Sequence, residues 1–296
     1  YHVPTGQVSI SSKEFEGIIK CIGISNILSP EDWINKLMNN QLKKEDICIT
    51  FDDALLCQFT IALPVLEKYN LRAFWFIYSS VFNGELEKFE IYRKFRLRYF
   101  DSFDEFFDSF IRTYSMLNYP KIDGTKYGDK IGIMKSQYSF YSINDILYRI
   151  IRDDVLSDQQ FESLMDNMLE ENGVSLLELA DGLWMADSHI KKLSDVGHFI
   201  GVHAYNHPYA LAKLSYESQL DQLQKNYNHI KKATNKDPVS MSYPNNSYNQ
   251  DTINILKELD IVCGFRAIMG KTNQKSIVDS ALTLPRIDHS NIIRLR

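Results

Sequence analysis

The chain has 296 residues, of which 44% are hydrophobic and 12% aromatic, which suits one large globular domain or one domain with a substantial insertion. Its formal net charge of −5 gives no electrostatic case for nucleic-acid binding. No apolar run approaches the roughly 18 residues that a membrane helix needs. The bulk composition therefore favours neither a nucleic-acid-binding nor a membrane-spanning protein, and it leaves open a locally basic groove.

The number and spacing of the cysteines indicate whether the protein belongs to a reducing or an oxidising compartment of the cell. Cys21, Cys48, Cys57 and Cys263 have the spacing of neither a zinc cluster nor a disulfide scaffold. We therefore expect reduced, mostly buried thiols and a cytoplasmic protein. No secretory signal is visible, although the sequence starts at Tyr1 without a methionine, which leaves open whether a leader precedes it.

Short apolar segments alternate with helical patterns along most of the chain. Ser29 followed by Pro30 predicts one helix start, and Ser215 predicts another helix that runs to about Ala233. Alternation of strand and helix predicts a parallel sheet with crossover helices, and six such units favour a barrel over an open sheet. The predicted strands, each bounded by turn or polar residues, are 47–51, 73–77, 199–202, 239–243, 261–265 and 284–287.

The stretch between the second and third predicted strands breaks this rhythm because it is rich in helical patterns and lacks clear strands. We interpret 84–183 as a helical insertion into a barrel made of 1–83 and 184–296. We expect its aromatic face to pack against the barrel; a lid, an oligomer interface and a sugar-stacking surface are the alternatives. The aromatic residues, spaced three and four apart, are Tyr92, Phe95, Tyr99, Phe103, Phe106 and Phe110.

Polar clusters follow four of the predicted strands. In a barrel of parallel strands these ends face one side, where active sites form. The sequence therefore predicts one site built from four separate segments. The clusters are Asp52–Asp53, His203 to His207 ("HAYNH"), Tyr243 to Asn246 ("YPNN") and Asp288–His289.

The two histidines of "HAYNH" are four residues apart. Pro208 follows His207 and biases it away from helical geometry, so we place the pair in the turn between strand and helix. Most HxxxH pairs are unrelated to any metal. With a carboxylate at a neighbouring strand end, however, this pair becomes a candidate zinc site of two histidines and one carboxylate, with a position left for water.

The adjacent carboxylates Asp52 and Asp53 have two interpretations. They could cap the helix that follows from about Leu55, since carboxylates are favoured at helix N-termini. Alternatively, one carboxylate binds a cation, which offsets the repulsion between them, and the other stays free to accept a proton from water. The two residues alone favour the first interpretation.

Taken together, the motifs resemble those of a known family. "TFDD" at 50–53, "HAYNHP" at 203–208 and a late histidine at a strand end resemble the polysaccharide deacetylases, carbohydrate esterase family four. The resemblance covers roughly 1–84 and 183–290. It implies a distorted (β/α)7 TIM-like barrel and leaves the helical insertion unexplained.

The resemblance also implies roles for individual residues. The metal would be divalent, with zinc preferred over cobalt, nickel or manganese. The activity implied is hydrolytic removal of an N-acyl group, acetyl before formyl, from an amino sugar in a glycan or glycan precursor; a non-catalytic carbohydrate-binding barrel is the alternative from another class. The implied residues are Asp52 as general base, Asp53, His203 and His207 as metal ligands, His289 as general acid, and Tyr243, Asn245 and Tyr205 near the substrate or its oxyanion.

Two positions depart from the family pattern. Ala54 stands where the family usually has glycine, from which we expect an ordinary backbone conformation there. Ser242 stands near the place of an arginine that pairs with the general base in many members. Arg286, which precedes Asp288 by two residues, could supply that charge to Asp52; equally, it could bind a helix or surface carboxylate.

Overall fold

The computed structural model describes residues 9–120, 124–137, 141–267, 281–289 and 292. These form two compact units, one containing Ile10–Glu87 with the described residues from Gly182 onward, the other containing Lys88–Asp181. The change of unit thus falls within a few residues of the positions 84 and 183 read from the sequence. Residues 1–8, which the resemblance includes, lie outside the described residues.

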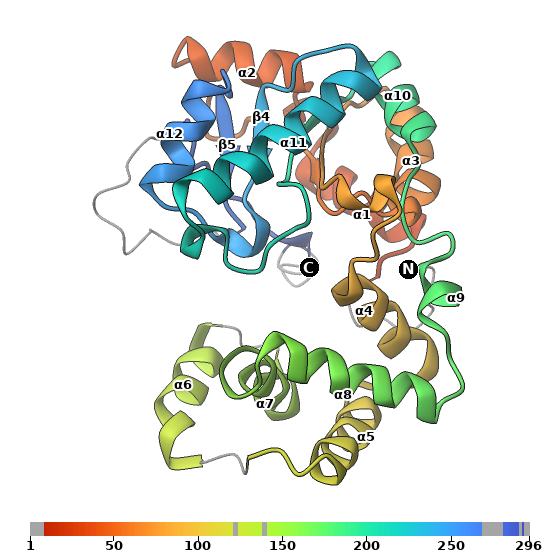
Figure 1. Cartoon of the computed structure of the whole chain (residues 1–296). Coiled ribbons are helices and arrows are strands. Elements are labelled where there is room, and N and C mark those ends of the chain that lie inside the picture. The colour runs from red at the N-terminus through yellow and green to blue at the C-terminus, as the bar shows by residue number, and fades with distance from the viewer. Residues whose placement is uncertain (1–8, 121–123, 138–140, 268–280, 290–291, 293–296) are drawn as a thin grey trace. The chain divides into compact units, whose positions relative to one another are not determined.

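A curled sheet of parallel strands organises the larger unit (Figure 1). The strands follow one another in sequence order across the sheet: β1 (Thr50–Phe51), β2 (Phe74–Ile77), β3 (Phe199–Val202), β4 (Ser240–Ser242) and β5 (Cys263–Phe265). All four pairings are parallel, which confirms the α/β class and the barrel-like curl. The described residues form five strands and so make half of a barrel.

The strand predicted at 284–287 reduces to one parallel bridge between Phe265 and Leu284. Pro285 explains this, because proline has no N–H to donate to a ladder. A second single bridge, between Ile27 and Ile47, continues the pairing beyond β1.

Helices flank the sheet where the capping residues predicted them. Ser29 accepts the Asp32 N–H at 3.1 Å, and Ser215 accepts the Ser218 N–H at 3.2 Å. The helices of this unit are α1 (Ser12–Ile22), α2 (Pro30–Met38), α3 (Leu63–Lys68), α10 (Asp187–Asp195), α11 (Tyr216–Thr234) and α12 (Gln250–Glu258). Shorter turns of 3₁₀ or π type lie at Ile24–Asn26, Gln58–Ala62, Ser80–Asn83, Leu211–Lys213 and Pro244–Asn246.

Both faces of the sheet are buried. Trp75 and Ile77 of β2 belong to the main core, whereas Phe74 and Phe76 point to a second cluster that includes Phe265. Side chains alternate between the faces of a strand, so a continuous apolar strand such as "FWFI" is what a sheet covered on both sides requires.

The Lys88–Asp181 unit is helical and has its own aromatic core. Phe106 and Phe110 contact the ring of Tyr148, with centroids 5.4 and 5.1 Å apart, and Tyr92 contacts Phe161. The predicted aromatic face thus makes ring contacts within its own unit, and the expectation that it packs against the barrel stays a prediction. The helices are α4 (Lys88–Tyr99), α5 (Phe103–Met116), α6 (Gly124–Gln137), α7 (Ile143–Ile150), α8 (Asp158–Glu171) and α9 (Leu176–Ala180), with a π turn at Ile151–Val155.

None of the described helices is long and apolar enough to cross a bilayer. The four cysteines are free thiols, as expected, but they are less buried than predicted. Cys263 alone among them is buried, Cys48 and Cys57 are half-buried, and Cys21 is exposed.

Candidate active site

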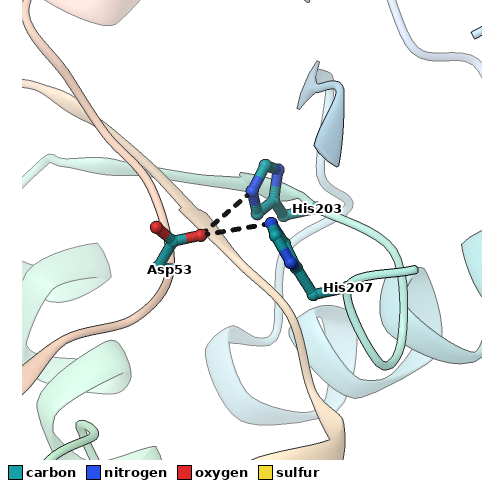
Figure 2. Close-up of side chains that lie close together, drawn as sticks. All are labelled: Asp53, His203 and His207. Atoms are coloured by element: carbon teal, nitrogen blue, oxygen red, sulfur yellow. Dashed lines mark ion pairs between the residues drawn. The ribbon is translucent and has the colours of Figure 1, made fainter. Parts of the chain in front are cut away.

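Three side chains from two strand ends converge on one point (Figure 2). The Oδ1 atom of Asp53 lies 3.3 Å from Nε2 of His203 and 3.5 Å from Nε2 of His207. One potential ligand atom from each residue lies within 4.8 Å of the others, and no other such group occurs in the part of the chain that the structure describes. One carboxylate oxygen and two imidazole nitrogens are the donor set of many catalytic zinc sites, so these residues fit a divalent cation.

The backbone around these ligands adopts unusual conformations. Asp53 has φ of 76°, and in the "HAYNH" loop Ala204 has 62° and His207 has 52°. Left-handed geometry costs a non-glycine residue roughly 1–2 kcal/mol. Ala54 also has φ of 55°, which contradicts the ordinary conformation expected for it. The chain therefore keeps the left-handed turn that glycine would favour and tolerates an alanine in it, and Ala54 is buried, at 1% exposure.

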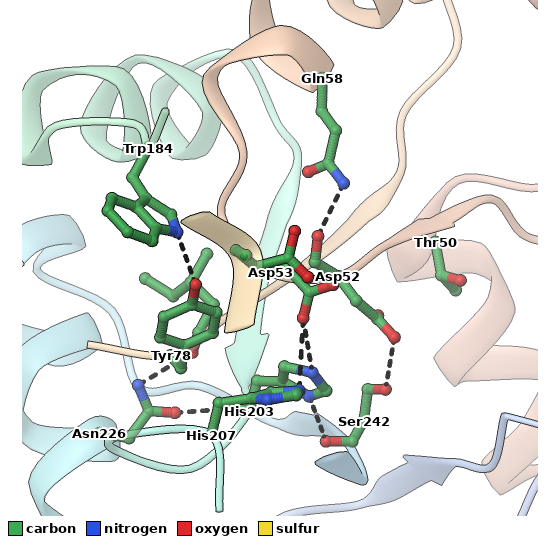
Figure 3. A network of polar contacts seen from close by, with 12 residues as sticks. Thr50, Asp52, Asp53, Gln58, Tyr78, Trp184, His203, His207, Asn226 and Ser242 are labelled. Atoms are coloured by element: carbon green, nitrogen blue, oxygen red, sulfur yellow. Dashed lines mark hydrogen bonds and ion pairs between the residues drawn. The ribbon is translucent and has the colours of Figure 1, made fainter. Parts of the chain in front are cut away.

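His203 is fixed in orientation by its second ring nitrogen. Its Nδ1 lies 2.7 Å from the carbonyl oxygen of Ser242, and because a carbonyl can only accept, Nδ1 carries the proton (Figure 3). In the neutral ring, Nε2 then directs a lone pair toward the carboxylate of Asp53. Two acceptors at that distance need a proton or a cation between them.

The pKa of His203 is consistent with this need. Burial lowers the pKa of His203, but the carboxylates of Asp53 and Asp52 and the Ser242 carbonyl together raise it by more. The net pKa therefore lies above its usual value. In the absence of a metal the site thus attracts a proton to the same place where a cation would bind.

The carboxylate of Asp52 forms an ion pair with Arg286. Nη1 of Arg286 donates to Oδ1 of Asp52 at 2.8 Å and Nη2 donates to Oδ2 at 2.7 Å, a bidentate pair. Ser242 sits between them: its hydroxyl donates to Asp52 at 3.1 Å and accepts from Arg286 at 2.8 Å. Of the two partners considered for Arg286, the structure selects Asp52.

The charge at Asp52 is stabilised by these neighbours. Burial would raise the pKa of its carboxyl group, but the positive charges of Arg286 and His203 outweigh burial and hold the pKa below its usual value. Asp52 is therefore ionised at neutral pH and able to accept a proton. The interpretation of Asp52–Asp53 as a simple helix cap is not supported, because both carboxylates contact other strand ends.

Gln58 and Tyr78 join the site without having been predicted. Gln58 donates from Nε2 to the backbone carbonyl of Asp52 at 2.7 Å. The ring of Tyr78 lies 5.3 Å from that of His207, and Trp184 donates its indole N–H to the Tyr78 hydroxyl at 2.5 Å (Figure 3). Tyr78 directly follows β2, so its place at a strand end was an available signal, whereas Gln58 lies in a π turn that the sequence gave no reason to expect.

The remaining predicted residues have other contacts in the structure. Tyr205 donates its hydroxyl to Glu85 at 2.6 Å, and Asn245 is exposed. The N–H of Tyr243 donates to the Phe265 carbonyl at 3.2 Å, so it is engaged in the sheet and is not available to an oxyanion in this structure. Nδ1 of His289 lies 3.5 Å from Oδ1 of Asp288, and no hydrogen bond or ion pair links His289 to Asp52 or the metal-ligand cluster among the described residues.

Comparison with known proteins supports the resemblance. A family model described as polysaccharide deacetylase matches residues 153–264, a segment that contains His203 and His207. Asp52, Asp53 and Arg286 lie outside the matched segment. A comparison with curated protein sequences finds no significant match.

Solved deacetylase structures share the fold. Streptococcus pyogenes deacetylase PplD in complex with acetate is 16% identical, with 99% of this chain and 92% of that chain covered and a TM-score of 0.55. IcaB from Ammonifex degensii is 13% identical, with coverage of 96% and 86% and a TM-score of 0.55. A de-N-acetylase from Aggregatibacter actinomycetemcomitans is 12% identical, with coverage of 100% and 91% and a TM-score of 0.53.

The curled parallel sheet, with polar side chains at its carboxyl edge, has the fold of a distorted (β/α) barrel. The resemblance to the polysaccharide deacetylase family read from the motifs is confirmed by the family match and by this shared fold.

Proposed function

We propose that the chain is a metal-dependent hydrolase that removes an N-acyl group, acetyl in preference to formyl, from an amino sugar in a glycan or glycan precursor. The observation that carries the proposal is that two adjacent carboxylates have different partners. Asp53 lies within 3.5 Å of two imidazole nitrogens, while Asp52 is held 2.7–2.8 Å from a guanidinium group on its other side.

When bound at Asp53, His203 and His207, a divalent cation would lower the pKa of a water molecule and polarise the substrate carbonyl. Zinc suits these donors best, although cobalt, nickel or manganese could replace it. The family match and the donor set support metal binding at this point.

Asp52 is proposed as the general base. Arg286 keeps it ionised and fixes its plane, and Gln58 fixes its backbone, so the carboxylate is ready to take a proton from the attacking water. His289 is proposed as the acid that protonates the amine as the C–N bond breaks, a role required because an unprotonated amine is a very poor leaving group. That role rests on the family resemblance.

The test uses the purified full chain loaded with Zn²⁺ and a panel of N-acetylated and N-formylated glucosamine monomers and oligomers. Release of acetate or formate, together with the appearance of a primary amine, is measured for the parent and for Asp52→Asn. We expect Asp52→Asn to keep bound metal and to lose hydrolysis by about 10²–10⁴-fold, the usual contribution of a general base.

Other outcomes of the panel decide between the alternatives. Hydrolysis of formylated substrates alone would change the acyl group but keep the mechanism. A parent that binds Zn²⁺ and glycans but hydrolyses none of the panel would contradict the enzymatic proposal and favour a carbohydrate-binding barrel.

A further inference from the structure

Two of the amide side chains of helix α11, Gln222 and Asn226, are four residues apart and therefore lie on one face. The helix packs against β3 and between α10 and α12 (Figure 1). Asn226 bonds at the ends of two strands, and Gln222 bonds to the loop that follows β3. Each of them bonds to the backbone of the loop that carries the two candidate histidine ligands.

Asn226 links the ends of two strands. It is fully buried, at 0% exposure, and its Oδ1 accepts the backbone N–H of His203 at 2.8 Å. Its Nδ2 donates at 2.9 Å both to the Ile77 carbonyl and to the Ser79 hydroxyl. One side chain thus joins the end of β2 to the first residue after β3 (Figure 3).

Gln222 holds the middle of the same loop. Its Oε1 accepts the backbone N–H groups of Tyr205 and Asn206, both at 3.1 Å. On the other side, the Tyr205 carbonyl accepts the N–H groups of Ser79 and Ser80, both at 2.8 Å. The loop between the two histidines is therefore held from both sides through its backbone.

This support matters because the loop is held in an unfavourable conformation. Ala204 and His207 have φ of 62° and 52°, which residues with a Cβ atom rarely adopt without outside support. Metal–ligand distances in protein sites lie within about 0.2 Å of standard values, so a ligand loop has to be placed accurately. Partners outside the ligand set typically contribute 10–100-fold to metal affinity when they fix ligand orientation.

We infer that Gln222 and Asn226 are positioning residues that hold the His203–His207 loop in its ligand geometry before the cation binds. The inference rests on the proposed metal site. It assigns these two amides of α11 to metal affinity, although neither would touch the metal or the substrate.

Gln222 provides the cleaner test because it is only half-buried. Zn²⁺ affinity is measured by competition with a chromophoric chelator for the parent, Gln222→Leu and Gln222→Glu. We expect Gln222→Leu to weaken binding about tenfold or more. Gln222→Glu keeps an oxygen that accepts both N–H groups, so it should bind Zn²⁺ within about threefold of the parent. Gln224→Leu is the matched control, since Gln224 bonds on the same helix to Asn228.

Asn226 requires a control of equal burial. Gln219 lies on the same helix at 0% exposure, donates to the Leu214 carbonyl at 3.0 Å and accepts from the Thr252 hydroxyl at 2.5 Å. Asn226→Leu and Gln219→Leu should both lower the melting temperature of the metal-free protein. At a temperature where circular dichroism finds both variants folded, only Asn226→Leu should lose Zn²⁺ affinity.

The outcomes separate this inference from the proposed function. A parent that binds Zn²⁺, with Gln222→Leu binding equally well, overturns the inference alone. So does an equal loss of affinity in Gln219→Leu and Asn226→Leu, because the effect would then be general destabilisation. A parent that does not bind Zn²⁺ overturns the proposed metal site and the inference together.

Discussion

Arg286→Met is the substitution that most directly tests how Asp52 works. Methionine keeps much of the apolar length of the side chain but removes the guanidinium group. The change deletes both charge-assisted bonds to Asp52 and the bonds to the hydroxyls of Ser242 and Thr50. Asp52 is then left beside the like charge of Asp53, with Ser242 as its hydroxyl donor.

The solvent exposure of the Arg286–Asp52 pair determines how much free energy its loss should cost. The Arg286 side chain is 16% exposed and that of Asp52 is 25% exposed, so solvent screens the pair only in part. Exposed ion pairs are worth about 0–1 kcal/mol, whereas removing one partner of a buried pair costs about 3–5 kcal/mol. We take about 3 kcal/mol, the lower end of the buried range. If the whole of this free energy is added to the activation barrier of the step in which Asp52 accepts a proton, turnover falls roughly a hundredfold.

Metal affinity should respond differently. Arg286 bonds to Asp52, Ser242, Thr50 and the Arg266 carbonyl, and none of these is a proposed ligand. Removing a positive charge near a cation site should leave Zn²⁺ affinity unchanged or raise it. A large fall in kcat with no fall in Zn²⁺ affinity is therefore the expected signature.

The assay follows acetate release at saturating Zn²⁺ for the parent, Arg286→Met and Arg286→Lys. Lysine keeps the charge without the planar fork, so its turnover should lie between the other two. Arg72→Met is the control, since Arg72 donates to a backbone carbonyl in the same unit. Turnover of Arg286→Met within threefold of the parent, or a parallel loss of bound Zn²⁺, would refute the reasoning.

Three further predictions concern stability and can be checked by denaturant or thermal unfolding. Gly201→Ala should destabilise the protein by about 1–3 kcal/mol, because its Cβ would lie 2.5 Å from the Phe76 ring, whereas Gly128→Ala, with open space in α6, should stabilise it by about 0.5–1 kcal/mol. Burial and then Arg72 lower the pKa of His198 from 6.5 to about 4, so its contribution to stability is complete above pH 6.5 and is lost as the pH falls toward 4, by up to about 3 kcal/mol. In His198→Asn, whose side-chain oxygen can still accept the Ala73 N–H, this pH dependence should disappear; its persistence would assign it to another group. Zn²⁺ at a hundred times its Kd should add about 2.7 kcal/mol to the free energy of unfolding, and a chelator should reverse the gain; no shift would contradict the metal site.

Much of the site could be predicted because strand ends are visible in a sequence. "FWFI" and "FIGV" are apolar runs bounded by polar residues, and β2 and β3 begin and end within one residue of the predicted limits. Once the strands are parallel, their carboxyl ends share an edge, so Asp53, His203 and His207 lie on the same side of the sheet. Their convergence across the intervening strand β2 then depends on the loops that follow β1 and β3.

What the sequence could not reveal depends on contacts between distant residues. Left-handed geometry at Ala54 results from tertiary packing that overrides the local preference of alanine. The Tyr243 N–H bonds to Phe265 because β4 pairs with β5 in one particular register, which no local pattern specifies. No sequence pattern distinguishes Asn226 from the other polar residues of its helix, and its 0% exposure emerges only when α11 packs against β3.

Ser242 explains why the charge for Asp52 can come from a different segment of the chain. A serine at the end of β4 is small enough to leave space beside Asp52, and the guanidinium of Arg286 occupies that space from the segment after the Leu284 bridge. The same residue presents its carbonyl to Nδ1 of His203 at 2.7 Å. The side chain of Ser242 therefore contacts the proposed base, and its backbone orients a proposed metal ligand. An arginine at position 242 would occupy the space in which the guanidinium group of Arg286 now binds Asp52. We therefore infer that serine at 242 and arginine at 286 depend on each other.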